Sequence, residues 1–361
     1  MKRINVTKTF LPPIEEYEQY LKEIWQRVHL TNQGPLLLEF EEKAKQYLGV
    51  DDFHFVTNGT LALQVAMSAL DITGGEVITT PFSYVATVSS ILWEKATPVF
   101  VDIEPDTFCL DPSKIEAAIT AETKAIMPVH VFGNPCDVEK IGAIAKRYKL
   151  KVIYDAAHAF GVQYKGKSLF SYGDISICSF HCTKLFHTIE GGAVIAQDKA
   201  VSQKVELIKR FGHNADDHYM LGINAKASEF QAAMGLCNLK HVDDIIAARK
   251  VRLELYNQLL GSKFQKLHIR ENTKYNYGYY PVVLKDEAHL LKTIEALNAE
   301  DIFPRRYFYP SLNTLPYLNN SQSCPVSEKV ASSIICLPLH SELEEEDIKR
   351  ICEIVKSRNA T

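Results

Sequence analysis

The hydrophobic pattern along the chain begins with helical periodicity and then changes to a repeating order of strand and helix. Residues 14–28 carry apolar side chains at helical spacing, and a second helix is predicted over 36–48, after the turn NQGP. The predicted strands that follow are 76–80, 97–103, 124–131, 151–155 and 175–180, with helices predicted at 60–70, 112–120 and 137–149. Strands that are apolar on both faces and alternate with helices indicate a mostly parallel sheet covered on both sides.

A different pattern follows a long helical region at about 226–260. The sequence then predicts a strand at 276–285, a helix at 290–298, a strand at 333–340 and a closing helix at 344–355. A chain of 361 residues is long enough for about two domains. We therefore expect a large domain over residues 1–250 and a small C-terminal α/β domain over residues 251–361.

Composition and charge exclude several classes of protein. The chain has 40 basic and 44 acidic residues, a formal net charge of −4, which argues against binding nucleic acid through a bulk positive field. No apolar run approaches the ~18 residues of a membrane span, and the N-terminus does not resemble a signal peptide. We expect a cytoplasmic globular protein with neither a nucleic-acid nor a membrane partner. Its eight cysteines lack the spacing of a metal site and are expected to be reduced and buried.

Polar residues follow several predicted strands, at the edge where open α/β sheets bind ligands. The segment TNGT at 57–60 precedes a helix, where a glycine and small hydroxyl residues suit phosphate binding but also form ordinary turns and N-caps. Asp155 ends one strand, where it would equally well cap the next helix. Lys184 follows the next strand between Ser179 and a Gly-Gly turn, although a lone lysine is more often a surface residue.

Five segments in this order are specific enough to indicate a family: TNGTLAL, PFSYVAT, YDAAHAFG, SFHCTK…EGGAV and LGINAKASEFQAAMG. With the late LPLHSELEEEDI, they resemble the DegT/DnrJ/EryC1/StrS family of pyridoxal-phosphate-dependent nucleotide-sugar aminotransferases, from about residue 8 to the end of the chain. The resemblance implies an α/β protein of transferase fold type I, the aspartate aminotransferase-like fold. It also implies pyridoxal 5'-phosphate as cofactor and a homodimer with shared active sites.

The resemblance implies a role for each matching residue. Lys184 resembles the lysine that forms a Schiff base with the cofactor and then moves the proton, and Asp155 resembles the carboxylate paired with the pyridinium nitrogen. His158 stands where many family members have a Gln that contacts the ring oxygen. The other cofactor-binding residues implied are Gly59, Thr60 and Ser179 for the phosphate, Tyr84 for stacking on the ring, and Asn224 for the phosphate in the neighbouring subunit.

Two residues near these motifs depart from the family pattern. Lys226 stands where the motif often has Arg. A lysine cannot replace the two-pronged contact of an arginine with an anion, so the sequence leaves open whether such a contact exists here. His187 has no family role to transfer, and we expect it to be a surface histidine. Dehydratase relatives replace the Schiff-base lysine with histidine, whereas Lys184 is present in register, so transamination is expected rather than dehydration.

The opening TKTFLPPIEEY…LTNQGPL and the segment GINAKASEFQAAMG most resemble the subgroup that makes dTDP-4-amino-4,6-dideoxyglucose. This implies transfer of an amino group from L-glutamate to a dTDP-linked 4-keto-6-deoxyhexose, for surface polysaccharide such as lipopolysaccharide O-antigen. Two alternatives stay open, a carbon-3 aminotransferase acting on the 3-keto isomer and a non-catalytic regulatory protein that binds the cofactor. The candidate substrate contacts are Asn32, His213, Arg305 and Arg306, the two arginines as a pair facing the pyrophosphate, although exposed Arg pairs also occur as ordinary surface.

Overall fold

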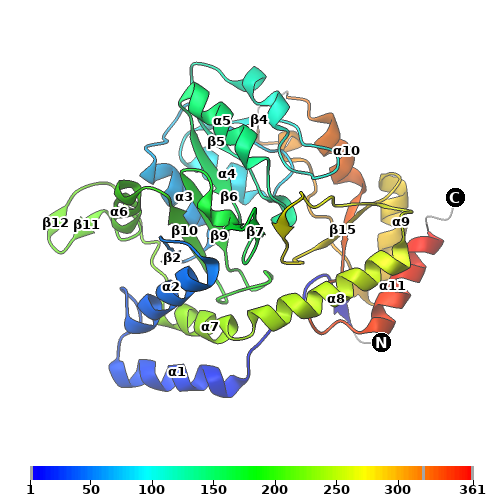
Figure 1. Ribbon diagram of the computed structural model, residues 1–361, viewed down its shortest axis with the longest axis horizontal. Coiled ribbons are helices and arrows are strands. Elements are labelled where there is room, and N and C mark those ends of the chain that lie inside the picture. The colour runs from blue at the N-terminus through cyan, green and yellow to red at the C-terminus, as the bar shows by residue number, and fades with distance from the viewer. Residues whose placement is uncertain (1–2, 319–321, 359–361) are drawn as a thin grey trace.

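The computed structural model describes residues 3–318 and 322–358 (Figure 1). The α-helices are α1 (Ile14–Arg27), α2 (Pro35–Leu48), α3 (Gly59–Ala69), α4 (Ala86–Trp93), α5 (Val138–Tyr148), α6 (Lys199–Ile208), α7 (Glu229–Leu239), α8 (Val242–Leu260), α9 (Glu287–Asn298), α10 (Pro325–Ser333) and α11 (Glu345–Ser357). The strands are β1 (Ile4–Asn5), β2 (His54–Val56), β3 (Glu76–Thr79), β4 (Thr97–Phe100), β5 (Thr123–Met127), β6 (Lys151–Asp155), β7 (Gln163–Tyr164), β8 (Lys167–Ser168), β9 (Ile175–Ser179), β10 (Gly192–Ala196), β11 (His213–Asn214), β12 (Asp217–His218), β13 (Gln265–Lys266), β14 (Thr273–Lys274), β15 (Tyr280–Val283), β16 (Ile302–Phe303) and β17 (Ile334–Leu337).

The main sheet is mostly parallel, as predicted. In the described part of the chain it has seven strands in the order β2-β10-β9-β6-β5-β3-β4. The pairs β3–β4, β3–β5, β5–β6 and β6–β9 are parallel, and β10 is antiparallel to both of its neighbours. The neighbouring strands β6 and β9 end at Asp155 and Ser179, so their carboxyl ends bring these two residues to one edge of the sheet.

Helices cover both faces of this sheet because their apolar residues fall on one side of each helix. On one face, α2, α5 and α7 bury residues such as Phe40, Ile141 and Leu236 in one core. On the other face, α3 and α6 bury Leu63 and Val205 in a second core, which α3 fills with small residues along most of its length. The two cores fix the sheet, and with it the strand ends that carry the candidate site.

The C-terminal residues form a separate antiparallel sheet, β13-β15-β17, packed with α8, α9 and α11 around a third core. The predicted boundary between residues 250 and 251 falls inside α8, which leads from the main sheet toward the C-terminal helices (Figure 1). Short pairings of β1 with β16 and of β7 with β14 also join early and late parts of the chain. The division into two domains stays a prediction.

Two predicted helical regions differ in the structure. Residues 112–120 form two short 3₁₀ helices, Pro112–Lys114 and Glu116–Ala118, because Asp111 caps the first and the backbone amide of Thr120, just after the second, donates to the hydroxyl of Thr123. The region 226–260 is two helices, since Lys226 is still extended and bridges to β2, and Ser228 then starts α7 with a capping box. The remaining predicted strands and helices correspond to elements of the structure.

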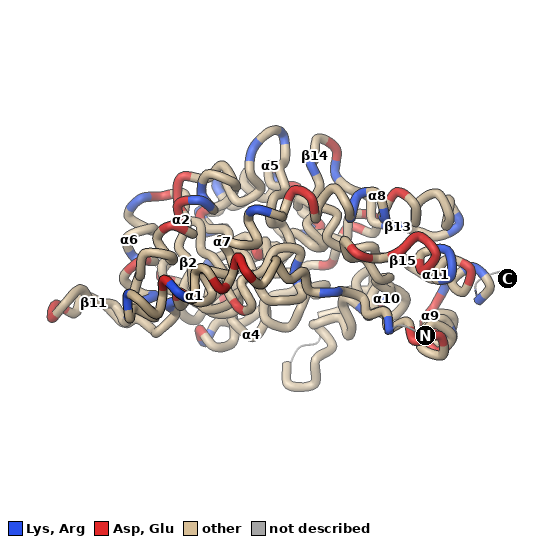
Figure 2. The backbone as a smooth tube through the Cα atoms, turned by 90° about the horizontal axis from the view of Figure 1, so that it is seen from below, with Lys and Arg blue, Asp and Glu red and all other residues tan. Residues whose placement is uncertain are grey.

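Charges of both signs are interspersed along the chain (Figure 2). No helix within residues 3–318 and 322–358 is long and apolar enough to cross a membrane. Over the same residues, no group of three or more His, Cys, Asp or Glu is placed to hold a metal ion. The eight cysteines are free, and all but Cys182 are buried, in agreement with the prediction for the thiols.

Candidate active site

A cavity of about 350 Å³ lies where β6 and β9 end, and segments far apart in the sequence line it. Its walls contain every residue that was predicted to hold the cofactor within a single subunit. These residues are Gly59, Thr60, Tyr84, Asp155, His158, Ser179 and Lys184. Tyr84 is 62% exposed, so its ring is a wall of the cavity rather than part of the core.

The start of α3 forms a cradle suited to phosphate. Asn58 caps the helix by accepting a hydrogen bond from the amide of Leu61 at 2.9 Å, and Gly59 and Thr60 occupy the first turn. A β-carbon on Gly59 would lie 2.9 Å from the β-carbon of Ser179, so the glycine allows α3 to begin against the end of β9. The hydroxyl of Ser179 therefore lies beside the first-turn amides, whose N–H groups and helix dipole favour an anion.

Asp155 is a buried carboxylate held by two donors. The hydroxyl of Thr87 donates to Oδ2 at 2.8 Å, and the amide of Ala157 donates to Oδ1 at 3.2 Å. The hydroxyl of Ser83 lies 2.8 Å from that of Thr87 and extends the chain of hydrogen bonds. Burial raises the pKa of Asp155, while these donors and nearby Lys184 oppose the rise. A buried carboxylate in this state is suited to pair with a cationic ring nitrogen.

Lys184 lies in the loop that follows β9, and its side chain faces the cavity. Its amide donates to the carbonyl of His181 at 2.8 Å, which turns the chain at this point. Burial lowers the pKa of Lys184, and the opposite charge of Asp155 partly restores it. The lowered pKa increases the fraction of neutral amine, which is the form that attacks a carbonyl carbon.

His158 is oriented as a hydrogen-bond donor. The amide of Phe132 donates to Nδ1 at 3.2 Å, which leaves the proton of the neutral ring on Nε2. Burial and the charge of Lys184 hold the pKa of His158 well below its usual value, so the ring is neutral. Phe308 stacks on it, with centroids 5.6 Å apart and planes 4° from parallel. This donor fits the ring oxygen of pyridoxal phosphate, as the phosphate cradle and Asp155 fit its other polar groups.

The sequence prediction missed several residues of the cavity wall. Tyr279 and Phe308 reach it from the C-terminal part of the chain, and Thr87 supports Asp155 from behind. Thr87 belongs to the quoted segment PFSYVAT, so a signal for it existed. The two aromatic residues carry no comparable signal, because only the fold brings them over the ends of β6 and β9.

Four other predicted residues lie outside the described lining of this cavity: Asn32, His213, Asn224 and Arg306. Asn32 is exposed in the loop before α2, and His213 lies in the β11–β12 hairpin, where Nδ1 donates to the carbonyl of Ala215 at 3.0 Å. Asn224 is exposed and bridges to Arg210.

The two predicted arginines differ in their surroundings. Arg305 lines the cavity, whereas Arg306 forms an ion pair with Glu287 at 2.6 Å and lies 3.4 Å over the ring of Tyr309, so the role of the pair toward a pyrophosphate stays a prediction. The prediction of a surface histidine is wrong, because His187 is only 2% exposed. Lys226 places its ammonium 5.1 Å from the ring centroid of Phe211 and is absent from the described cavity lining.

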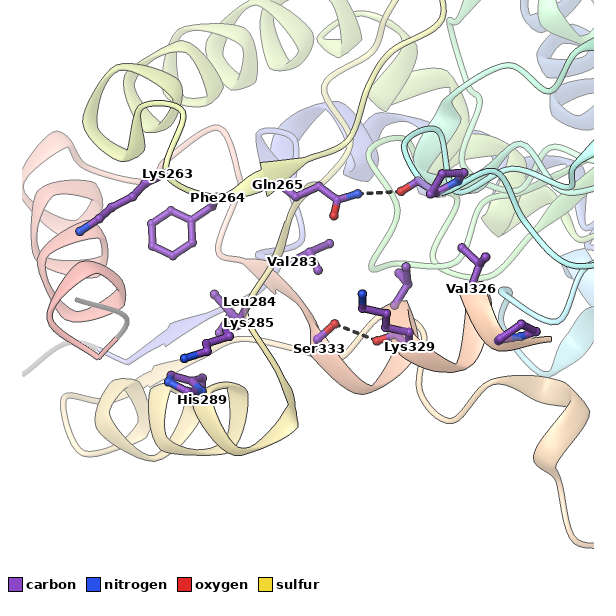
Figure 3. A pocket seen from close by; sticks show the side chains of 13 residues that line it. Lys263, Phe264, Gln265, Val283, Leu284, Lys285, His289, Val326, Lys329 and Ser333 are labelled. Atoms are coloured by element: carbon purple, nitrogen blue, oxygen red, sulfur yellow. Dashed lines mark hydrogen bonds between the residues drawn. The ribbon is translucent and has the colours of Figure 1, made fainter. Parts of the chain in front are cut away.

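A larger hollow of about 640 Å³ lies on the C-terminal elements (Figure 3). Phe264 and Val283 line it together with Lys263, Lys285 and Lys329. All three lysines are exposed, and the hollow contains none of the residues predicted for the site. The cavity at β6 and β9 is therefore the candidate active site.

Known proteins resemble this chain over nearly its whole length. A dTDP-4-amino-4,6-dideoxy-D-glucose transaminase of Shigella dysenteriae is 42% identical to this chain. The alignment covers 98% of this chain and 99% of the Shigella protein. A GDP-perosamine synthase of Caulobacter vibrioides is 35% identical over 97% of each chain. The crystal structure of DesI in the presence of its TDP-sugar product superposes with a TM-score of 0.93 at 31% identity, covering 99% of this chain and 93% of that one.

The family model and the structural neighbours together identify the class of protein. The fold is that of the pyridoxal-phosphate-dependent sugar aminotransferases, and among the structural neighbours is one solved with its bound cofactor PMP. The protein is therefore an aminotransferase with pyridoxal phosphate as its cofactor. The model of the DegT/DnrJ/EryC1/StrS aminotransferase family matches residues 13–356, and the chain belongs to this family.

Proposed function

We propose that the protein transfers the amino group of L-glutamate to a dTDP-linked 4-keto-6-deoxyhexose, giving dTDP-4-amino-4,6-dideoxyglucose for surface polysaccharide. The observation that carries the reaction is the meeting of Lys184, Asp155 and His158 in one cavity beside a phosphate cradle. The choice of sugar is supported by the identity of 42% with the Shigella transaminase, against 35% with the GDP-perosamine synthase.

Each side chain of the cavity has a part in this proposal. Gly59, Thr60 and Ser179 bind the cofactor phosphate, and Tyr84 lies against its ring. When bound, pyridoxal phosphate supplies an electron sink for proton removal from the carbon that carries nitrogen. Lys184 moves that proton, and Asp155 keeps the ring nitrogen protonated. Arg305 is the cation of the cavity wall that is available to an anionic group of either substrate.

The proposal includes a homodimer with shared active sites. Asn224 is exposed outside the described lining of its own cavity, as expected of a residue that serves the phosphate of a second copy. Large apolar side chains lie at the surface nearby: Leu221, which is 90% exposed, and Phe211, whose amide donates to the carbonyl of Ile223. Burying them against a second copy would remove this apolar surface from water. The proposed place of action is the cytoplasm, in keeping with the free thiols.

The sugar is tested by incubating the enzyme with L-glutamate and dTDP-4-keto-6-deoxyglucose and locating the new nitrogen by NMR. We expect amination at carbon 4. Amination of the 3-keto isomer alone would overturn the proposed substrate in favour of the carbon-3 reaction.

The reaction class is tested separately, by spectroscopy. Purified protein with bound cofactor should be yellow, and L-glutamate should bleach its visible absorption band. Lys184→Ala should abolish turnover and keep the fold, which circular dichroism measures. A cofactor-bound protein that glutamate does not bleach and that aminates neither sugar isomer would support the non-catalytic regulatory alternative.

A further inference from the structure

His187 is buried three residues after Lys184 and uses both nitrogens of its ring. The amide of Ile189 donates to Nδ1 at 3.1 Å, so the neutral ring carries its proton on Nε2, which donates to the carbonyl of Phe10 at 2.7 Å. The amide side chain of Asn238 donates to the backbone carbonyl of His187 at 2.8 Å. The histidine therefore connects three elements: its own loop, the N-terminal segment and α7.

The loop that carries Lys184 is closed on itself at its base. The amide of Phe180 donates to the carbonyl of Gly191 at 2.8 Å, and the amide of Thr188 donates back to the carbonyl of Phe180 at 3.0 Å. Inside the closed loop, Phe186 is buried against Phe160, with ring centroids 4.0 Å apart. These bonds fix the base of the loop. The position of Lys184 then depends on the contacts that hold the rest of the loop, away from its base.

The N-terminal segment, residues 7–10, holds that side. The hydroxyl of Thr9 donates to the carbonyl of Cys182 at 2.9 Å, on one flank of Lys184, and Phe10 accepts from His187 on the other. Thr7, in the same segment, lines the cavity. Just before it, β1 pairs in parallel with β16, and the amide of Leu339 donates to the carbonyl of Val6 at 3.0 Å. The segment thus connects the Lys184 loop to the C-terminal core.

We propose that His187 is a positioning residue for Lys184, acting with Thr9 by fastening the Lys184 loop to the N-terminal segment. The proposal rests on the proposed role of Lys184 and goes beyond it, because His187 lies outside the described cavity lining. A displacement of about 1 Å of a reacting group can reduce the rate of a reaction by about a hundredfold. Two hydrogen bonds that flank Lys184 are therefore enough to affect catalysis.

The test compares His187→Ala, His187→Gln and Thr9→Val in the cofactor-bound enzyme. His187→Ala should reduce kcat about 10- to 100-fold with little change in KM for the keto-sugar, because orientation rather than binding is lost. It should also shift the pH at which the visible absorption band of the bound cofactor changes. The side chain of His187→Gln can still donate to the carbonyl of Phe10 and should recover most of kcat. Thr9→Val should reduce kcat by about fivefold, the effect of one hydrogen bond.

The double variant Thr9→Val with His187→Ala should lose less than the product of the two single losses, since both act through one loop. The control is His340→Asn, which changes another buried histidine outside the cavity lining and should leave the band and kcat unchanged. A His187→Ala enzyme with normal kcat and an unshifted band overturns the proposal, even if it melts at a lower temperature. If His187→Ala does not fold, Thr9→Val is used instead, and a normal kcat with an unshifted band in that variant overturns the proposal. Turnover that survives in Lys184→Ala would instead overturn the proposed function, whatever His187 does.

Discussion

The carboxylate of Asp155 obtains its hydrogen bonds from a hydroxyl and an amide, and its nearest opposite charge is Lys184 across the cavity. Hydrogen bonds to the charged form of a buried carboxylate favour ionisation, whereas burial opposes it. The balance between the two is set by Thr87, which the hydroxyl of Ser83 orients. Thr87 therefore controls the charge that a cationic ring nitrogen meets.

Replacing Thr87 by Val removes this hydroxyl at almost constant volume. Burial already raises the pKa of Asp155, and loss of the donor raises it further, so the carboxylate protonates at a higher pH. We expect affinity for pyridoxal phosphate to fall about tenfold at neutral pH, because a hydrogen bond to a charged group is lost. The acid limb of cofactor binding should also move to higher pH, which fluorescence titration at several pH values measures. Ser90→Ala on the same helix is the control, and an unmoved acid limb would contradict the prediction.

Sequence reasoning succeeded for residues at the ends of strands and failed for residues that depend on long-range packing. Asp155 ends one apolar strand of the sheet and Lys184 lies in the loop after the neighbouring strand, so their meeting at one edge could be predicted. His187 was predicted to be exposed because nothing in its local sequence shows that Phe10 and Asn238 cover it. Phe308 was missed for the same reason, since the C-terminal chain returns to the cavity only through the fold.

At the scale of elements, the close approach of α3 to β9 makes the phosphate cradle. Gly59→Ala places a β-carbon 2.9 Å from that of Ser179, so helix and strand must separate or the residues must strain. We expect a lower melting temperature and an affinity for pyridoxal phosphate weakened at least about tenfold, since the first-turn amides move away from the phosphate.

A second substitution separates the steric effect from the chemical one. Ser179→Gly in the Gly59→Ala background removes the opposing β-carbon and the hydroxyl together. The melting temperature should then rise toward that of the wild type, while affinity for the cofactor stays low. If the melting temperature and the affinity for the cofactor both recovered, the hydroxyl of Ser179 would have no part in binding the cofactor.

A partly buried group of charges joins β2 to α6. His54 lies 3.2 Å from carboxylate oxygens of both Asp52 and Glu206, and the ammonium of Lys209 lies 2.9 Å from Glu206. Burial opposes the charged form of His54, but the two carboxylates outweigh it and raise its pKa. Burial likewise opposes ionisation of Glu206, but His54 and Lys209 lower its pKa to about 2.

These shifts predict how stability depends on pH. The raised pKa of His54 contributes stability that is complete below its unfolded value of about 6.5 and is lost as the pH rises through the folded value. The contribution of Glu206 is complete above about 4.5 and is lost only as the pH falls through about 2. His54→Gln should therefore destabilise the protein by about 1–2 kcal/mol near pH 5.5 and by less near pH 8.5, measured by urea unfolding. His218→Gln, at the exposed end of the β11–β12 hairpin, should change stability little at either pH.

Most elements of the fold could be predicted because their periodicity is local. The strands β3, β4, β5, β6 and β9 are short apolar runs between helices, and their parallel pairing follows from that alternation. The segment 112–120 was predicted as one helix because its apolar spacing resembles one, yet it forms two short 3₁₀ helices, of which Asp111 caps the first. The strand β10 runs antiparallel to β9, to which the Lys184 loop at 180–191 connects it, and periodicity does not record this direction.

At the scale of the whole molecule, the cavity is completed by parts of the chain that are distant in sequence. The N-terminal segment supplies Thr7, and the C-terminal part supplies Arg305 and Tyr307. The amide of Leu312 donates to the carbonyl of Pro81 at 2.7 Å, and Asp102 accepts from the first amides of α10, so the C-terminal chain is fastened to the main sheet. A second copy would add a further contributor to this cavity.

The shared site can be tested by mixing two defective chains. Lys184→Ala removes the reacting amine, and Asn224→Asp places a negative charge where a phosphate of the neighbouring subunit is expected, so each variant alone should have little activity. In a homodimer that exchanges subunits, about half of the dimers are mixed, and each mixed dimer has one site free of both changes. The mixture should therefore recover about a quarter of the wild-type rate.

The control mixture uses Lys184→Ala with Asp155→Asn, whose defects lie in the same cavity of one chain. Each site of its mixed dimers then keeps one defect, so no recovery is expected. If activity recovers in the first mixture but not in the second, Asn224 belongs to the site of the neighbouring subunit. Only then do the changes at Lys184 and Asn224 fall in the same site of a mixed dimer and leave the other site intact. If neither mixture recovers although tagged chains show that subunits have exchanged, each cavity works with its own chain alone and the shared site is wrong.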